Sequence, residues 1–184
     1  MSLGALDSDG VLAGAAQDPS PNCDERPEGA SITLLVVHNI SLPPGVFGGD
    51  AITQLFTNVI DYSAHPFYET LRTLRVSAHF LIRRDGALIQ FVPCTKRAWH
   101  AGPSNWCGRE RCNDFSLGVE LEGVDDQAYD EPQYLRLAEL AIVLRRHYPI
   151  TDIVGHSDIA PGRKTDPGPA FDWGRLRALL AGIP

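Results

Sequence analysis

Ile32-Thr33-Leu34-Leu35-Val36-Val37-His38 is a nearly continuous apolar run that ends on an imidazole. Such a run is typical of a strand that is buried on both faces, as in sheets with parallel strands. A loop rich in proline and glycine follows, from residue 39 to residue 49, and loops of this kind often carry binding groups. We therefore expect a central strand that delivers His38 to one fixed place at its end.

Two further segments predict strands that join this one. Residues 116–122 alternate strictly, which places Leu117, Val119 and Leu121 on one face, and the other face carries Ser116, Gly118, Glu120 and Glu122. Asp85-Gly86 separates residues 77–84 from residues 87–92 and predicts a hairpin whose two turn residues both have positive φ. The first face of 116–122 should pack in the core, and the second should face a site or water.

Helical patterns alternate with these strands. Residues 50–60 predict a short helix with one apolar face, formed by Ile52, Leu55, Phe56 and Val59. Asp130 and Gln133 form a capping-box pattern at the start of a helix that we expect to end near residue 148. A short strand over residues 152–156 follows, and Asp172 caps a last helix. These pieces predict an α/β fold, a single domain in which helices flank a central mixed β-sheet.

Length and composition set the limits of this prediction. The chain has 184 residues, 43% of them hydrophobic and 21% charged, which suits one soluble domain with its own core. The net charge of −7 gives no general reason to bind nucleic acid, and no apolar run approaches the roughly 20 residues of a membrane helix. We expect no nucleic-acid partner, no membrane partner and a monomer.

The first 22 residues contain no lysine or arginine. A secretory signal needs a basic segment before its apolar part, so we expect a cytoplasmic protein with a flexible N-terminal arm over residues 1–22 and one folded domain over residues 23–184. In that compartment the four cysteines should be free thiols, and their spacing does not fit a structural zinc site. They are Cys23, Cys94, Cys107 and Cys112.

A second polar stretch, residues 155–169, concentrates titratable groups among prolines and glycines. It offers His156 and Asp166 as metal ligands, but a catalytic zinc ion needs three protein ligands and an open position for water. We expect His38 to supply the third ligand, because it and His156 both stand where an apolar strand gives way to a loop. His79 and His100 could line a cleft, but neither has a carboxylate at ligand spacing.

Several long motifs occur in a family-specific order. They are residues 35–41 (LVVHNIS), 75–79 (RVSAH), 97–102 (RAWHAG), 108–114 (GRERCND), 118–123 (GVELEG) and 163–169 (RKTDPGP). On these motifs the chain resembles the zinc-dependent N-acetylmuramyl-L-alanine amidases of the type-2 amidase and peptidoglycan-recognition group. It looks most like the cytoplasmic AmpD-type branch, which recycles 1,6-anhydro-muropeptides. The resemblance spans residues 24–180.

The resemblance implies roles for five residues. His38, His156 and Asp166 would bind zinc, Glu120 would be the acid/base carboxylate and Lys164 would assist catalysis. The chemistry agrees with these roles: zinc acidifies water, a carboxylate can move the proton, and an ammonium group can stabilise an oxyanion. Strand alternation alone leaves Glu122 as a rival to Glu120.

The implied reaction is hydrolysis of the amide between the lactyl group of a muramic acid and the L-alanine of its stem peptide. A muropeptide carries carboxylates, which arginine binds with paired hydrogen bonds. Arg75 and Arg111 are therefore expected to bind these carboxylates, Asn39 to orient the peptide and Trp99 to pack against the sugar.

Two other functions stay open at this point. Some members of the resembled superfamily bind peptidoglycan without cleaving it, although in those a zinc ligand is replaced, and here all three ligand positions are filled. A structural zinc site in a regulatory protein would need four closed positions, and no fourth ligand is evident.

Overall fold

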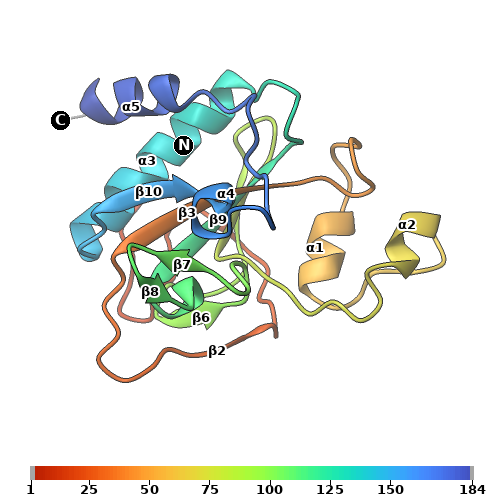
Figure 1. The fold of residues 1–184 in the computed structure, drawn as a ribbon, viewed down its shortest axis with the longest axis horizontal. Coiled ribbons are helices and arrows are strands. Elements are labelled where there is room, and N and C mark those ends of the chain that lie inside the picture. Colours follow the sequence, from red (N-terminus) through yellow and green to blue (C-terminus); the bar gives the residue numbers. More distant parts are fainter. Residues whose placement is uncertain (1–2, 183–184) are drawn as a thin grey trace.

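A six-stranded mixed sheet organises the protein in the computed structural model, which describes residues 3–182 (Figure 1). The strands lie in the order β1 (Ala16–Gln17), β5 (Leu88–Gln90), β4 (Phe80–Ile82), β9 (Ser116–Glu122), β3 (Leu34–Ile40) and β10 (Asp152–Gly155). Strands β4, β9, β3 and β10 run parallel, whereas β5 is antiparallel to β4 and parallel to β1. The predicted α/β fold with a mixed central sheet is confirmed.

Smaller elements surround this sheet. Two short antiparallel pairs join β2 (Cys23–Glu25) to β6 (Lys96–Ala98) and β7 (Asn105–Trp106) to β8 (Arg109–Glu110). The helices are α1 (Ala51–Phe56), α2 (Pro66–Glu69), α3 (Glu131–His147), α4 (His156–Ile159), α5 (Trp173–Gly182) and the 3-10 helix η1 (Cys112–Asp114). None of the helices within residues 3–182 has the length and apolar character needed to cross a bilayer.

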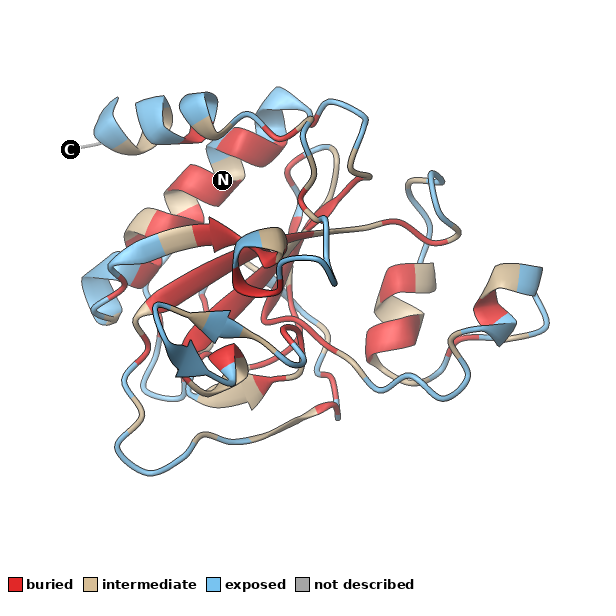
Figure 2. Cartoon of the chain, in the orientation of Figure 1, coloured by how far each residue is buried: buried red, intermediate tan, exposed pale blue. Residues whose placement is uncertain are grey.

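The core lies on both faces of the central strands. On one face, side chains of β3 and β9 such as Val37 and Val119 pack against Leu137 and Leu144 of α3, and α5 packs on α3 in turn (Figure 1). On the other face, Val36 belongs to a smaller cluster that includes residues of β10 and α4. Figure 2 shows the buried residues concentrated on the central strands and along α3. Strand β3 is therefore buried on both faces, as its apolar run predicts.

The register of the two central strands positions the site. His38 on β3 lies directly opposite Glu120 on β9, because the parallel pairing runs from Leu34 opposite Ser116 to Ile40 opposite Glu122. The prediction that His38 ends its strand is wrong by two residues, because β3 continues to Ile40 through this pairing. His156, expected as the last residue of a strand, is instead the first residue of α4.

The N-terminal segment also differs from its prediction. Residues 3–22 pack as part of the domain: Leu6 and Leu12 are buried, β1 pairs with β5, and the backbone N–H of Leu12 donates to Gln90 Oε1 at 2.8 Å. Contacts with residues almost 80 positions away stabilise this segment, and sequence periodicity does not reveal such contacts. Residues 1 and 2 of the expected arm lie outside the described part of the chain.

Three local regions follow or depart from their predicted structure. Helix α1 ends at Phe56, and Asn58 adopts a positive φ of 62°, so Val59 turns outward and is 68% exposed instead of buried. The hairpin of β4 and β5 is present, but of its two predicted turn residues only Gly86 has a positive φ. The start of α3 after Asp130 and the four free thiols are as predicted.

Candidate active site

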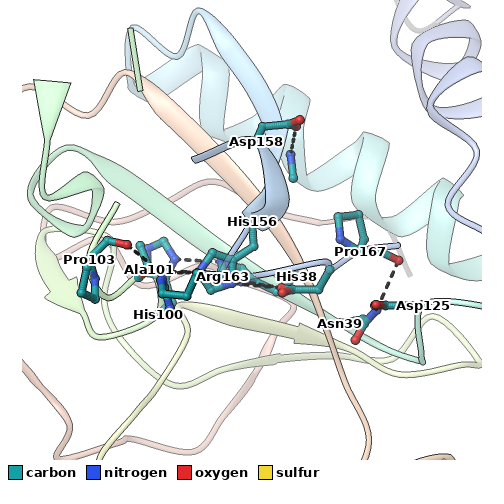
Figure 3. A network of polar contacts seen from close by, with 12 residues as sticks. His38, Asn39, His100, Ala101, Pro103, Asp125, His156, Asp158, Arg163 and Pro167 are labelled. Atoms are coloured by element: carbon teal, nitrogen blue, oxygen red, sulfur yellow. Dashed lines mark hydrogen bonds and ion pairs between the residues drawn. The ribbon is translucent and has the colours of Figure 1, made fainter. Parts of the chain in front are cut away.

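The three predicted ligands lie close together. His38 Nδ1 from β3 lies 2.9 Å from His156 Nδ1 at the start of α4, and Figure 3 shows these two residues side by side. Each of these nitrogens lies 3.1 Å from Asp166 Oδ2 in the following loop. Both histidines are buried and Asp166 is partly buried. Within residues 3–182, these three side chains form the one group with metal-ligand spacing.

The hydrogen bonds of His156 show which of its nitrogens is free. Its Nε2 lies 3.0 Å from the carbonyl oxygen of Ala101, which can only accept, so Nε2 carries the ring proton. In the neutral ring Nδ1 then presents a lone pair toward the carboxylate of Asp166. Burial lowers the pKa of the adjacent His38 to about 4, so the ring of His38 is neutral at pH 7. A carboxylate and imidazole nitrogens that converge in this way suit a divalent cation, and two histidines with one carboxylate suit zinc.

The loop that carries Asp166 is fixed by contacts on both sides. The carbonyl oxygen of Asp166 accepts from the backbone N–H of Ser157 at 2.9 Å, and the carbonyl of Pro167 accepts from Tyr129 Oη at 2.8 Å and from Asn39 Nδ2 at 3.2 Å. Gly168 has a φ of 81°, and a Cβ there would lie 2.3 Å from the Cα of Asp125. Only glycine permits this close approach, which holds the ligand loop against residues 123–129.

Glu120 and Lys164 share a cleft with the three ligands. The cleft has a volume of about 650 Å³, and one wall is apolar; its lining includes Leu42, Leu55, Phe67, Leu71 and Val76. Among the described residues, Glu120 Oε2 has no hydrogen-bond partner although it is shielded from solvent. Burial, together with the nearby charge of Asp166, raises the pKa of Glu120 well above its ordinary value, and the charge of Lys164 opposes this rise. This carboxyl group is thus placed to exchange protons inside the cleft.

Glu122, the rival carboxylate, has a different environment. Its Oε1 pairs with Arg83 Nη1 at 3.1 Å and accepts from the backbone N–H of Gly48 at 2.7 Å, and its Oε2 accepts from the backbone N–H of Arg84 at 3.2 Å. Both oxygens are therefore occupied, and Glu122 does not line the cleft that holds the ligands. The hydrogen-bond partners of Glu120 and Glu122 therefore distinguish the two carboxylates, which strand alternation alone does not.

The four expected substrate-binding residues have different positions. Asn39 lines the cleft, and its amide nitrogen donates to Asp125 Oδ1 at 2.8 Å. Arg75 is exposed and donates to nearby backbone carbonyls, Trp99 is partly buried, and Arg111 is exposed with its Nε 3.2 Å from Asp114 Oδ2. These last three residues are not part of the cleft lining, so their substrate contacts stay predictions.

His100 is a cleft residue whose link to the ligands the sequence did not predict. Its Nδ1 lies 2.9 Å from Nε2 of His38, whereas the other ring nitrogen of His38, Nδ1, contacts Asp166. The next residue, Ala101, supplies the carbonyl that accepts from His156. The spacing of possible metal ligands in the sequence does not identify His100, because His100 contacts a proposed ligand and not the metal position itself.

The fold and the site define a class: an α/β domain whose cleft combines side chains suited to zinc with a carboxyl oxygen that is shielded from solvent and has no partner, as in hydrolytic metalloenzymes. A family model described as N-acetylmuramoyl-L-alanine amidase matches residues 28–169. The chain is 59% identical over 174 residues to the 1,6-anhydro-N-acetylmuramyl-L-alanine amidase AmpD of Escherichia coli strain K12, an alignment that covers 94% of this chain and 95% of that protein.

Solved structures agree with the sequence comparisons. The crystal structure of a selenomethionine AmpD derivative superposes with a TM-score of 0.93 at 57% identity, covering 96% of this chain and 99% of that one. The Escherichia coli amidase AmiD, in complex with anhydro-N-acetylmuramic acid-L-Ala-D-gamma-Glu-L-Lys, superposes with a TM-score of 0.59 at 28% identity, covering 87% of this chain and 66% of that one. The chain belongs to the N-acetylmuramoyl-L-alanine amidase family. The prediction of an amidase, in preference to a binding module without activity, is confirmed.

Proposed function

We propose that this chain hydrolyses the amide between the lactyl group of 1,6-anhydro-N-acetylmuramic acid and the L-alanine of its stem peptide, with zinc bound by His38, His156 and Asp166. The observation that carries the proposal is the convergence of three ligand atoms, 2.9 to 3.1 Å apart, in the wall of a cleft that also holds an unpartnered carboxylate. The names of the high-identity relatives support the anhydro-sugar as substrate.

Zinc, when bound to three ligands with a fourth position open, supplies a Lewis acid that acidifies water and polarises the amide carbonyl. Glu120 takes a proton from the attacking water at its free Oε2, and the hydroxyl adds to the lactyl carbonyl carbon. Glu120 then donates that proton to the nitrogen of L-alanine as the carbon–nitrogen bond breaks. The raised pKa of Glu120 suits this second step, because a buried carboxyl group holds a proton until the amine needs it.

Lys164 and the apolar wall complete the proposed site. Lys164 lines the cleft, and its ammonium group stabilises negative charge on the former carbonyl oxygen, an effect worth about 3 kcal/mol per donor in comparable sites. Leu55, Phe67 and Leu71 keep water from one side of the cleft, which strengthens these charge interactions.

The remaining contacts belong to the substrate's peptide and sugar. We assign the peptide carboxylates to Arg75 and Arg111, whose guanidinium groups are exposed, the peptide backbone to Asn39 and the sugar to Trp99. Arg111 shares its guanidinium with Asp114 through a single contact at 3.2 Å, which leaves donors for a carboxylate.

The enzyme is also proposed to act as a monomer in the cytoplasm. The main sheet ends at the short strands β1 and β10, and strands this short offer little edge for pairing with a second copy. Light scattering at micromolar concentration should give the mass of one chain, and a dimer mass would contradict the proposal.

The decisive experiment compares a 1,6-anhydro-muramyl tripeptide with its ordinary muramyl counterpart. Mass spectrometry should detect free stem peptide from the anhydro substrate with zinc, and its loss after chelation. Equal release from both substrates would contradict the proposed selectivity, and undiminished release from metal-free protein would contradict the zinc mechanism. Zinc bound without release from either substrate would contradict the proposed substrate.

A further inference from the structure

The buried hydroxyl of Ser116, at the start of β9, has two partners that fix its proton. Its Oγ lies 2.6 Å from the carbonyl oxygen of Cys112 and 3.1 Å from Nε2 of His100. A carbonyl can only accept, so the hydroxyl must donate its single proton to Cys112. Ser116 Oγ therefore accepts from His100, and His100 carries a proton on Nε2.

This assignment determines the role of the other nitrogen of His100. With its proton on Nε2, the neutral ring presents a lone pair at Nδ1, which lies 2.9 Å from Nε2 of His38. The hydrogen bond between the two rings then requires the proton of His38 to be on Nε2. As a result Nδ1 of His38 carries a lone pair, and it is the atom that faces His156 and Asp166.

The packing around His100 leaves little freedom for another arrangement. The ring lies against β9 at Gly118, where a Cβ would come within 2.5 Å of His100 Cγ. His79 borders it, with 5.8 Å between the ring centroids. The His79 ring is fixed as well, because its Nδ1 accepts from the backbone N–H of Gly118 at 3.0 Å and its Nε2 lies 3.1 Å from the carbonyl of Lys96. The ring of His100 is thus closely packed between Gly118 and His79.

We propose that His100, anchored by Ser116, is a positioning residue that holds His38 in the tautomer whose Nδ1 faces the metal position. The inference rests on the proposed metal site, but it does not depend on the identity of the substrate. His100 contacts His38, and the Ala101 carbonyl contacts His156. Each proposed histidine ligand is thus hydrogen-bonded, through the nitrogen that does not face the metal position, to residue 100 or 101. Partners of this kind orient a ligand and typically change metal affinity by about 10- to 100-fold when removed.

The first test reads the tautomers directly. Long-range proton–nitrogen correlation spectra of histidine-labelled protein, without and with zinc, should show protonated Nε2 in both His38 and His100. A protonated Nδ1 on His38 in metal-free protein at pH 7 would overturn the proposal. This readout needs no variant, so it holds even if substitutions impair folding.

The second test changes the acceptor while keeping the shape of the side chain. His100→Phe removes the acceptor for His38, and zinc affinity, measured by competition with a chromogenic chelator, should fall at least 10-fold. His100→Asn places an oxygen near the position of Nδ1 and should recover most of this loss. The matched control is His79→Asn, a change in the neighbouring buried ring that should leave zinc affinity within about twofold.

The outcomes separate this inference from the proposed function. Wild-type affinity in folded His100→Phe protein, or equal losses in His100→Phe and His79→Asn, would overturn the positioning role while leaving the metal site intact. Wild-type protein that binds no zinc would contradict the proposed metal site, and the tautomers of metal-free His38 and His100 would still decide the inference.

Discussion

Two glutamates on one face of β9 show how neighbours decide the role of a residue. Glu120 lies opposite His38 and has an unpartnered oxygen in the cleft, whereas Glu122 is held by Arg83 and by two backbone N–H groups. A buried carboxylate whose hydrogen bonds are all satisfied stabilises the fold and keeps its side chain in one position. A buried carboxylate that lacks a partner costs stability, and this cost is typical of functional groups.

These environments predict opposite effects for the same substitution. Glu120→Gln should lower kcat by about 100- to 10,000-fold, because an amide cannot transfer the proton, while zinc content stays unchanged. Glu122→Gln should keep kcat within about threefold but lower the free energy of unfolding by about 1 to 3 kcal/mol, because the partly buried guanidinium of Arg83 loses its charged partner. Steady-state kinetics, metal analysis and chemical denaturation check both variants. Loss of zinc in Glu120→Gln would make Glu120 a ligand instead of an acid/base group.

Arg111 gives a second test at the scale of one residue. If it binds a peptide carboxylate equally in the ground state and the transition state, Arg111→Ala should raise KM more than it lowers kcat. Arg109→Ala is a suitable control, because the Arg109 guanidinium lies over the Phe115 ring, 3.8 Å from its centroid, and has no assigned substrate contact. A loss confined to kcat would move Arg111 into the catalytic group.

Local patterns predicted several site-bearing elements well. Strand β9 has the bounds that its alternation predicts, and α3 begins directly after Asp130, because both signals involve residues that are close in sequence. The contact of His100 with His38 joins residues 62 positions apart and depends on the pairing of β3 with β9. No single-sequence period encodes such a contact. The candidate ligands His38 and His156 are even farther apart in sequence, but their motifs and their positions near strand ends identified them, and no such signal linked His100 to His38.

The N-terminal segment, residues 3–22, gives a prediction at the scale of elements. Leu12 is 1% exposed in the main core, so Leu12→Ala should lower the free energy of unfolding by about 2 to 4 kcal/mol. Leu135→Ala, at a position that is 49% exposed on α3, should change it by less than about 0.5 kcal/mol. Denaturation curves of the two variants decide the point. Equal stabilities would mean that the segment contributes nothing to the core and would restore the expectation of a flexible arm.

Strand β2 is tied to η1 through a charge network that depends on pH. Arg97 contacts Asp24 Oδ2 at 2.6 Å and Asp114 Oδ1 at 2.5 Å, and its hydrogen bond lowers the pKa of Asp24 below the ordinary 3.8. A lowered folded-state pKa adds stability above the unfolded-state pKa, and this stability is lost as the pH falls through the folded-state value.

Asp24→Asn should therefore lower the free energy of unfolding at pH 7 by about 0.5 kcal/mol, a small value because the pair is partly exposed. The difference from wild type should vanish as the pH falls below the lowered folded-state pKa of Asp24, where the carboxyl group is protonated in both states. Denaturation at several pH values tests this, with Glu28→Gln as an exposed control. A difference that persists unchanged in acid would show that the effect is not electrostatic.

In the molecule as a whole, the proposed metal ion joins three segments that are far apart in the sequence. His38 belongs to the central strand, His156 begins α4, and Asp166 lies in a loop held by Tyr129 and Asn39. The unfolded chain cannot bring the three ligands together, so zinc should bind the folded state almost exclusively. At a free zinc concentration 100 times Kd, this linkage adds about 2.7 kcal/mol to the free energy of unfolding.

For a chain of this size that gain corresponds to a rise in Tm of about 5 to 10 °C, which a chelator should reverse. Asp166→Asn should abolish the rise at the same zinc concentration, because an amide is a poor zinc ligand. Glu122→Gln provides the control: its Tm starts lower, but zinc should raise it as much as in wild type, since Glu122 lies outside the cleft that holds the ligands. Calorimetry with and without zinc measures all three proteins. An equal rise in Asp166→Asn and wild type would place the stabilising zinc elsewhere, whereas its loss in Asp166→Asn alone would tie the stability of the fold to the three proposed ligands.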